Sequence, residues 1–219
     1  GEGGLAFDFI PGIGLLRSDD GGATWLLPDE VRASQFYTLS VDPRNPDVVL
    51  AGTNEGLLSS SDGGHSWEMR ISDPGIVGVT ELVRSSSDPD RLWAAVWCSI
   101  TCPAGLDRIM RSDDGGVTWL PSGAGVPPAT FNDPLYNRLS LAVAPSDHDV
   151  LYAGFEVREG VGGGSFVYRS SDGGSTWQQT AYRGAYLRRQ SWYDNAITVA
   201  PEDPERVVAA GVWFVDSSD

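Results

Sequence analysis

The chain has 219 residues and a formal net charge of −15, because 30 acidic residues are set against 15 basic ones. A charge this negative argues against nucleic acid or an anionic membrane surface as a partner, since phosphates would be repelled over most of the protein. The sequence holds no apolar run near the length that spans a bilayer, so we expect no membrane insertion. Its 27 Gly, 14 Pro and 8 Trp are typical of many short strands joined by turns.

One eight-residue motif occurs four times and predicts the architecture. The copies are SDDGGATW (Ser18–Trp25), SSDGGHSW (Ser60–Trp67), SDDGGVTW (Ser112–Trp119) and SSDGGSTW (Ser170–Trp177). The paired glycines supply the positive φ angles of a tight turn between antiparallel strands, and the aspartate accepts bonds from backbone N–H groups beyond it. We therefore predict a self-capping turn in each copy. The structural carboxylates are those of Asp20, Asp62, Asp114 and Asp172.

Two further expectations follow from this motif. Each copy offers one or two carboxylates and lacks the distal Glu of a calcium loop, so we expect no metal in the turns, and nothing else in the chain predicts a cofactor. The tryptophan that ends each copy is large enough to seal the base of its hairpin, so we expect it to be buried. These side chains are Trp25, Trp67, Trp119 and Trp177.

A second motif alternates with the first, as in SVDPRNPDVVLAGT (Ser40–Thr53) and VAPEDPERVVAAGV (Val199–Val212). A strand ends at Asp/Ala-Pro, an acidic turn follows, and a second strand ends in Ala-Gly or Ala-Ala. Apolar residues recur with a period of two in the first of these strands, which indicates one buried face. Joined to the turn motif, this gives units of four strands. In the clearest unit the strands are expected at about 36–41, 48–53, 57–61 and 66–71, with the Asp turn between the last two.

Repeated units of four short antiparallel strands predict an all-β fold, a β-propeller with Asp turns between the third and fourth strands of each blade. A stacked solenoid fits the unequal spacing of the turns less well. We expect about four to five blades in a single segment, 1–219, with blades at about 1–30 (partial), 31–73, 74–126, 127–183 and 184–219 (partial). The incomplete units at both ends predict either a fragment of a larger propeller or partial blades that complement one another. We favour the fragment, and we expect self-association through the open ends when the segment is made alone.

The two cysteines, Cys98 and Cys102, lie four residues apart and precede Pro103. A pair this close either closes a small disulfide ring or remains as two thiols, and we favour the disulfide. Zinc is not expected, because two thiolates alone do not make a closed site and neither histidine is near in sequence. A disulfide indicates an oxidising compartment, so we expect an extracellular or periplasmic protein.

Together, SxDxGxTW turns and DPxxPxxVxAG strands resemble the Asp-box, or bacterial neuraminidase repeat, β-propellers. That superfamily includes sialidases, xyloglucan-type glucanases, sortilin-like receptors and photosystem assembly factors. The stretch Gln190–Val212 is most similar to secreted bacterial propellers of this group. Sialidases of the superfamily carry Arg-Ile-Pro near their start, whereas this chain reads Phe9-Ile10-Pro11. The resemblance therefore implies a fold and the place of a site, and assigns no reaction.

In a propeller, the loops that join one blade to the next and the loops between second and third strands lie at one rim of the central channel. Here we expect the first kind at 27–35, 72–79, 120–137 and 182–193, and the second at 97–107 and 156–164. Hydrolysis of a glycoside needs two carboxylates placed across the scissile bond, and sugar binding adds aromatic faces, amides and arginines. The candidate catalytic residues are Asp194, Asp133 and Glu156. The candidate substrate-binding residues are Trp192, Tyr193, Arg138, Arg188 and Tyr136.

A structural interpretation stands beside this one: Trp192 and Tyr193 begin a buried inner strand, and the arginines pair with surplus acids. We expect a secreted propeller that binds or hydrolyses carbohydrate at the channel rim, with a glycan as ligand. The alternative is a non-catalytic scaffold that binds a protein or a peptide.

Overall fold

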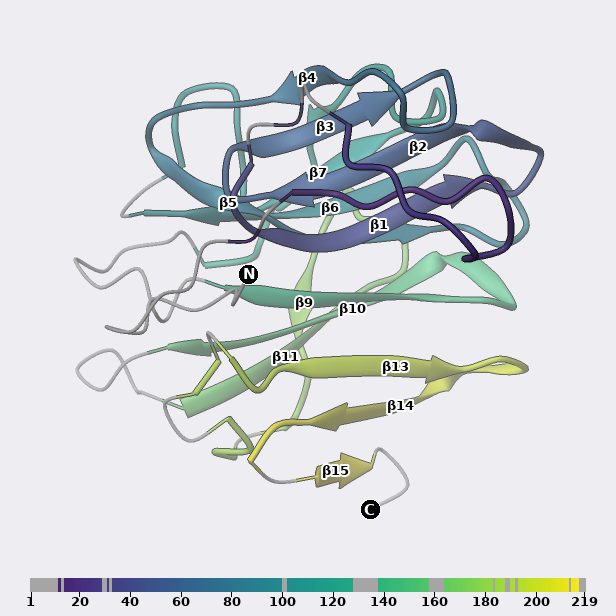
Figure 1. Ribbon diagram of the computed structural model, residues 1–219. Coiled ribbons are helices and arrows are strands. Elements are labelled where there is room, and N and C mark those ends of the chain that lie inside the picture. The colour runs from purple at the N-terminus through teal and green to yellow at the C-terminus, as the bar shows by residue number, and fades with distance from the viewer. Residues whose placement is uncertain are drawn as a thin grey trace.

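The computed structural model describes residues 12, 14–28, 31, 33–99, 102–127, 138–157, 164–182, 184–187, 190–191, 193–212 and 214–216. Within them every strand belongs to an antiparallel sheet, and none of these residues lies in a helix. Four sheets are stacked one on another along the chain, from the blue sheets at the top of Figure 1 to the yellow one at the bottom. This is the predicted all-β architecture of propeller blades.

Each sheet follows chain order from its inner to its outer strand. Blade 1 holds β1 (Phe36–Asp42), β2 (Asn45–Thr53), β3 (Gly56–Ser60) and β4 (Glu68–Ile71). Blade 2 holds β5 (Ile76–Arg84), β6 (Leu92–Cys98), β7 (Ile109–Ser112) and β8 (Leu120–Pro121). Blade 3 holds β9 (Leu139–Ala144), β10 (Asp147–Val157), β11 (Gly164–Ser170) and β12 (Gln178–Gln179). Blade 4 shows three strands, β13 (Ala196–Ala200), β14 (Asp203–Ala210) and β15 (Phe214–Asp216).

The strand bounds differ from the expected ones where turn chemistry competes with pairing. β4 begins at Glu68, two residues later than predicted, because the hydroxyl and N–H of Ser66 still bond to the Asp turn. Ahead of blade 1, where a partial blade is expected at about 1–30, the described residues form one isolated bridge, Arg17 with Leu26. The blade boundaries drawn from the sequence stay a prediction, since the chain is not described at several of them.

The core lies between blades, where middle strands such as β3 and β6 are buried on both faces. β6 reads LWAAVWC and is buried along its whole length. Its alternate residues point to opposite faces, as in any strand. Leu92 packs with Leu50 of blade 1, whereas Trp93 and Ala95 pack with Leu141 of blade 3. An apolar run without alternation is therefore what a strand between two neighbouring blades requires.

The inner strands lie next to one another in sequence order: β1 contacts β5, β5 contacts β9, and β9 contacts β13. The Ala-Gly pair that ends the second strand permits this close approach. A Cβ atom placed on Gly52 would lie 2.4 Å from the carbonyl oxygen of Val79, so only glycine fits between β2 and β5. Because all strands are antiparallel, the connections fall into two sets. We call the end with the first-to-second-strand turns and the Asp turns the turn rim, and the opposite end the loop rim.

The Asp turns are closed by their own carboxylates, as the clearest copy shows. Asp62 accepts the backbone N–H of Ser66 at 2.9 Å and the Ser66 hydroxyl at 2.6 Å. The Ser60 hydroxyl donates to Asp62 at 2.8 Å and accepts the N–H of Gly64 at 2.8 Å. Gly63 and Gly64 have φ angles of 69° and 91°, which other residues rarely adopt. These bonds favour the ionised carboxylate and hold the pKa of Asp62 below its usual range, with the Ser66 hydroxyl as the largest cause.

The prediction that all four motif tryptophans are buried is wrong. Trp177 is 3% exposed, but Trp25 is 59% exposed, and Trp67 and Trp119 are half-buried. The difference depends on the preceding blade. Trp177 donates its indole N–H to the carbonyl of Ser122, which follows β8. The turn itself therefore does not bury its tryptophan; a neighbouring segment does.

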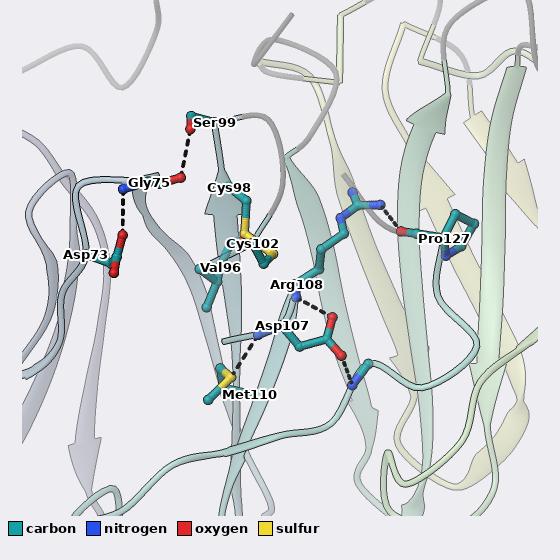
Figure 2. The surroundings of a disulfide bond; sticks show 11 residues. Asp73, Gly75, Val96, Cys98, Ser99, Cys102, Asp107, Arg108, Met110 and Pro127 are labelled. Carbon is teal, nitrogen blue, oxygen red and sulfur yellow. Dashed lines mark hydrogen bonds between the residues drawn. A yellow bond between two sulfur atoms is a disulfide. The ribbon is translucent and has the colours of Figure 1, made fainter. Parts of the chain in front are cut away.

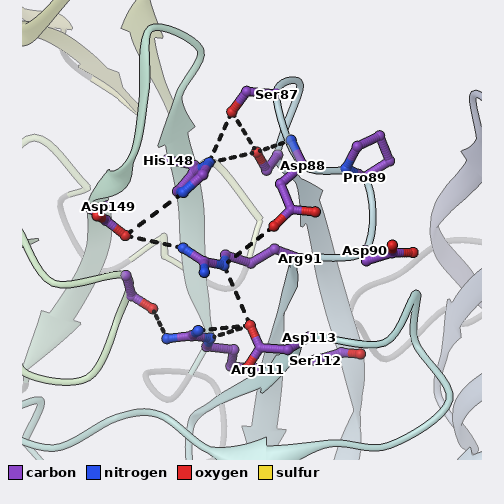
Figure 3. Close-up of polar contacts among 12 residues, drawn as sticks. Ser87, Asp88, Pro89, Asp90, Arg91, Arg111, Ser112, Asp113, His148 and Asp149 are labelled. Atoms are coloured by element: carbon purple, nitrogen blue, oxygen red, sulfur yellow. Dashed lines mark hydrogen bonds and ion pairs between the residues drawn. The ribbon is translucent and has the colours of Figure 1, made fainter.

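The turn rim also joins neighbouring blades by ion pairs (Figure 3). Arg91 of blade 2 lies 3.1 Å from Asp149 of blade 3 and 3.3 Å from Asp113. In the same manner Arg44 of blade 1 donates to Asp90 of blade 2 at 3.0 Å. The acidic turn residues that the second motif repeats are thus partners for arginines of the neighbouring blade.

Candidate functional site

The loop rim is shorter than the sequence predicted, because strands extend into it. The expected loop 72–79 is reduced to 72–75, since β5 begins at Ile76 and pairs with Cys98 of β6. Likewise Trp97 belongs to β6 and Glu156 to β10. Two register shifts in β5 allow this inner strand to continue to the rim.

A disulfide joins Cys98 and Cys102 at this rim, with an S–S distance of 2.03 Å (Figure 2). The ring that it closes is bonded to the loop entering β5. Ser99 donates its N–H at 2.9 Å and its hydroxyl at 2.8 Å to the carbonyl of Gly75, whose own N–H donates to Asp73 at 2.7 Å. The disulfide therefore fixes two adjacent loops of the rim relative to each other.

Arg108 follows this ring and connects blade 2 with blade 3. It is 3% exposed, and its guanidinium lies 4.7 Å from the centre of the Phe155 ring, a cation–π contact. Its Nη1 donates to the carbonyl of Pro127 at 3.0 Å (Figure 2). Burial lowers the pKa of Arg108 to about 10, so the side chain stays charged near neutral pH.

Of the predicted catalytic carboxylates, Glu156 is the one that the structure shows buried and hydrogen-bonded. It lies near the end of β10, is 7% exposed, and accepts the backbone N–H of Ser191 at 3.4 Å. Close by, the Tyr186 hydroxyl donates to Asn195 at 3.4 Å, and the Asn195 amide donates to the carbonyl of Gly154 at 2.9 Å. Burial is the main reason that the pKa of Tyr186 is raised, and the charge of Glu156 adds to it. The segment ahead of β13 is thus fastened to the end of β10.

A glycine makes this arrangement possible. A Cβ atom on Gly154 would lie 2.4 Å from the Tyr186 hydroxyl. The Ala-Gly pair of β10 therefore leaves room for a tyrosine from a loop, where the same pair in β2 leaves room for a strand. The sequence places Tyr186 in a rim loop but assigns no site role to it or to Asn195. The Ala-Gly pair before an aromatic loop is the sequence signal for this contact.

Of the other predicted residues, Asp194 and Tyr193 lie directly before β13. Tyr193 is 65% exposed, so the interpretation that it begins a buried inner strand is wrong. Asp194 is half-buried and donates its backbone N–H to Gln190 at 2.7 Å. Four predicted residues lie outside the described part of the chain: Asp133, Tyr136, Arg188 and Trp192.

Arg138 belongs to a second cluster that the sequence did not reveal. Its charge acts on Glu81 of β5 and on Tyr37 of β1, so three blades meet here. Glu81 accepts the N–H of Leu141 at 3.3 Å, and burial raises its pKa. Burial also raises the pKa of Tyr37 to about 12. The sequence signal for this cluster was Glu81, a single carboxylate within the otherwise apolar strand IVGVTELVR. In the structure Glu81 follows a register shift of β5.

Tyr37 completes the aromatic part of this second cluster. Its ring centre lies 6.4 Å from that of Trp97, and its hydroxyl donates to Gln35 at 2.6 Å. The tyrosine is therefore held by both its apolar body and its polar end. The structure thus contains two clusters of carboxylate, tyrosine and amide groups. One surrounds Glu156 at the loop rim, and the other extends from this rim to the half-buried Glu81 in the middle of β5.

On the opposite rim, Ser87, His148 and Asp149 only resemble a catalytic triad (Figure 3). The Ser87 hydroxyl lies 2.8 Å from His148 Nδ1, but His148 Nε2 is 4.0 Å from Asp149, beyond hydrogen-bond distance. Asp149 is bonded to Arg91 instead. We interpret these residues as a contact between blades.

No group of three metal-binding side chains occurs among the residues that the structure describes. In the same part of the chain, no helix is long and apolar enough to cross a lipid bilayer.

Comparison with known proteins gives two kinds of relative, and no family model matches the chain. Xyloglucanase Xgh74A of Acetivibrio thermocellus is 26% identical over 89% of this chain and 32% of its own length. The photosystem II assembly lipoprotein Ycf48 of Synechococcus sp. (strain CC9902) is 30% identical over 51% of this chain and 38% of its own length. The chain therefore spans about a third of the length of the curated relatives it matches.

Among solved structures, an ancestral GH74 enzyme superposes with a TM-score of 0.63 at 18% identity. The match covers 93% of this chain and 28% of that one. At this identity the likeness shows the fold alone, which agrees with the stack of four sheets.

Proposed function

We propose that this chain, whose fold and repeated turns resemble those of the Asp-box β-propellers, binds carbohydrate at the loop rim. The observation that carries this proposal is the cluster around Glu156, a buried carboxylate beside Tyr186 and Asn195. Carboxylates and amides bond sugar hydroxyls, and exposed aromatic rings pack on the C–H face of a pyranose. Tyr193, 65% exposed just before β13, supplies such a ring on the same segment.

The similarity to a xyloglucanase over most of the chain supports a neutral β-glucan as the substrate class. If the rim also hydrolyses its ligand, Glu156 is the candidate for one of the two carboxylates that hydrolysis needs. Asp194 and Asp133 are the candidates for the second carboxylate. The roles of Arg138, Tyr136, Arg188 and Trp192 in binding belong to this proposal too.

Isothermal titration with soluble xyloglucan oligosaccharides tests the binding, and a panel of chromogenic glycosides tests hydrolysis. We expect the wild type to bind, and Glu156→Gln, which keeps the shape of the side chain, to weaken binding at least about tenfold. Asp62→Asn on the turn rim is the matched control and leaves the affinity unchanged. Equal affinity of wild type and Glu156→Gln would contradict the proposed site.

A second candidate function is a scaffold that binds a peptide at the same rim. The similarity of half the chain to an assembly lipoprotein favours it, as does the cluster of Arg138, Glu81 and Tyr37, which presents both charges beside an aromatic ring. A peptide array read beside the sugar titration separates the two functions. Binding of peptides without any binding of sugars would support the scaffold.

The disulfide supports an oxidising compartment, so the proposed location is extracellular or periplasmic. Alkylation without reductant, followed by mass spectrometry of protein from its native source, tests this location. Two labelled thiols would contradict it.

A further inference from the structure

The outer surface between blades 1 and 2 holds a groove. Two hollows of about 140 and 350 Å³ meet there and share Arg70 and Val117 as lining residues. The larger volume lies at the lower end of the range of ligand pockets, about 300–1,000 Å³. We call this surface the junction groove. It is defined by Arg70, Asp73, Ala104, Leu106, Val117 and Trp119.

The groove exists because the chain leaves β4 differently from β8. After β8, the chain continues along the Asp turn of the next blade: Trp177 donates its N–H to Ala124 at 2.8 Å, and the Ser122 hydroxyl donates to Gly174 at 2.7 Å. This segment buries Trp177. After β4 the chain turns inward at once, since Ile76 donates its N–H to Asp73 at 3.1 Å and begins β5. Within the described part of the chain, no such segment covers Trp119, the tryptophan of the next Asp turn.

Trp119 is therefore half-buried where its equivalent, Trp177, is 3% exposed. Its indole N–H donates to its own turn at the Gly116 carbonyl, 2.9 Å away, which fixes the ring. Leu106 and the buried Met110 and Ile71 complete an apolar floor next to it. The groove thus presents part of a fixed aromatic ring to solvent.

Polar side chains also line the groove, and they are already held in place by hydrogen bonds and an ion pair. Arg70 donates from Nε to the Ser59 hydroxyl at 2.7 Å and pairs with Glu68 at 3.0 Å. Asp73 is held by the N–H of Gly75 at 2.7 Å, which is part of the contact with the disulfide ring. Groups held in this manner lose little conformational entropy when a ligand bonds to them.

We infer that the junction groove binds one or two sugar rings of a neutral glycan, as a second binding site separate from the loop rim. The C–H face of a pyranose fits an indole ring, and its hydroxyls match the guanidinium of Arg70 and the carboxylate of Asp73. An anionic ligand is disfavoured because Glu68 and Asp73 flank the groove and the chain carries a net charge of −15. The inference rests on the proposed function for the class of ligand.

A peptide added as a further strand beside β4 fits this surface less well. β4 has four residues, reads Glu-Met-Arg-Ile, and pairs with β3 through a register shift. Short, charged and irregular edge strands are those that resist pairing with another chain. The ligand therefore lies in the groove through side-chain contacts.

Filling the groove provides the test. Ala104 is exposed on its wall, so Ala104→Trp occupies the space without disturbing the core. In titrations with xyloglucan oligosaccharides we expect the wild type to show two sites. Ala104→Trp should remove one of them, and Asp73→Asn should weaken that site at least about tenfold. Trp25→Ala changes an exposed tryptophan of the same motif away from the groove and is the matched control, with both sites retained.

The outcomes separate this inference from the proposed function. Loss of one site in Ala104→Trp and of the other in Glu156→Gln supports both. One site in the wild type, lost in Glu156→Gln and unchanged in Ala104→Trp, overturns the inference and leaves the proposed function standing. No sugar binding by the wild type overturns both. Competition by a decapeptide of alternating Lys and Val, with no competition by sugar, would also overturn the inference.

Discussion

The two rims of the blades are built from the same strands but follow different rules. On the turn rim of blades 1 to 3, the first glycine of the Asp turn donates its N–H to the backbone carbonyl of an aspartate near the start of the second strand, namely Asp47, Asp90 and Asp149. On the loop rim one backbone bond repeats in blades 1 and 2, from the N–H of Asn54 to Gln35 and from the N–H of Ser99 to Gly75. The side chains that hold this rim differ, however: blade 1 uses Asn54 to accept two backbone N–H groups, whereas blade 2 uses a disulfide ring. The contacts of the turn rim repeat from blade to blade because a local motif specifies them, and they stabilise the blades. The side-chain contacts of the loop rim vary between blades, so this rim can carry a ligand site.

Carboxyl groups behave oppositely at the two rims. On the turn rim, the bond from the Thr24 hydroxyl lowers the pKa of Asp20 to about 2. The side-chain bond from Arg44 likewise lowers the pKa of Asp42 to about 2. Toward the loop rim, burial raises the pKa of Glu81. The difference indicates carboxylates stabilised in their charged form on one side and a carboxyl group disfavoured in its charged form on the other.

The largest expected effect tests what determines the contribution of a motif tryptophan to stability. We expect contact with the preceding blade to determine it, and not the turn itself. Trp177→Ala should lower the free energy of unfolding by about 3–5 kcal/mol, because it leaves a cavity between blades 2 and 3. Trp25→Ala, with the ring 59% exposed, should change it little. Urea unfolding measures both. Equal losses in the two variants would show that the turn alone decides.

The next effect concerns the repeated carboxylates. Asp62→Ala should destabilise the protein, though less than Trp177→Ala does, because backbone N–H groups of the turn lose their acceptor. The affinity for any ligand of the loop rim should stay the same, since the change lies at the other end of the blade. Thermal unfolding and sugar titration on the same sample measure both quantities. A changed affinity would contradict the claim that the turn rim serves stability alone.

The corresponding stability test on the loop rim removes the disulfide between Cys98 and Cys102. Replacing both cysteines by serine should cost about 2 kcal/mol, the loop-closure entropy of so short a ring. The effect should be local: amide exchange should accelerate at Ser99 and Ile76 and remain unchanged in the Asp turns. Uniform acceleration over the whole chain would show that the ring supports the global fold instead.

A smaller effect should appear on acidification, with opposite sign at the two rims. The pKa of Asp20 is lower in the folded state, so its contribution to stability is complete above the unfolded pKa and is lost as the pH falls from about 4 toward 2. The pKa of Glu81 is higher in the folded state, so its contribution falls as the pH rises through its unfolded value toward the raised one. Carboxyl carbon shifts in an NMR titration resolve both groups, and a lowered pKa at Glu81 would contradict this.

The smallest expected change is in association. Leu39 and Val41 of β1 are 57% and 52% exposed on blade 1. Such apolar side chains on one face favour self-association, which stays a prediction for this segment. Sedimentation should show a larger monomer fraction for Leu39→Ser/Val41→Ser than for the wild type. A wild type that is monomeric at every concentration would contradict the prediction.

The repeated turns could be predicted from the sequence because their bonds are local. Asp62, Ser60 and Ser66 lie within seven consecutive residues, so the eight-letter motif contains every partner that the turn needs. The two cysteines are equally close. Blade order, strand pairing and the turn rim follow from such short-range chemistry.

The candidate sites could not be predicted in this manner, because their partners come from different blades. Glu81 meets Arg138 and Leu141 only when β5 and β9 lie side by side, and Gly154 admits Tyr186 only once the segment before β13 folds back. The exposure of Trp119 depends on how far the chain runs after β4, a property absent from its own motif. By itself, then, the sequence determined the turns, the strands and the β-propeller. Only the tertiary structure decided which carboxylates are buried and where the surface is open, because burial is a property of neighbours that the chain brings together from a distance.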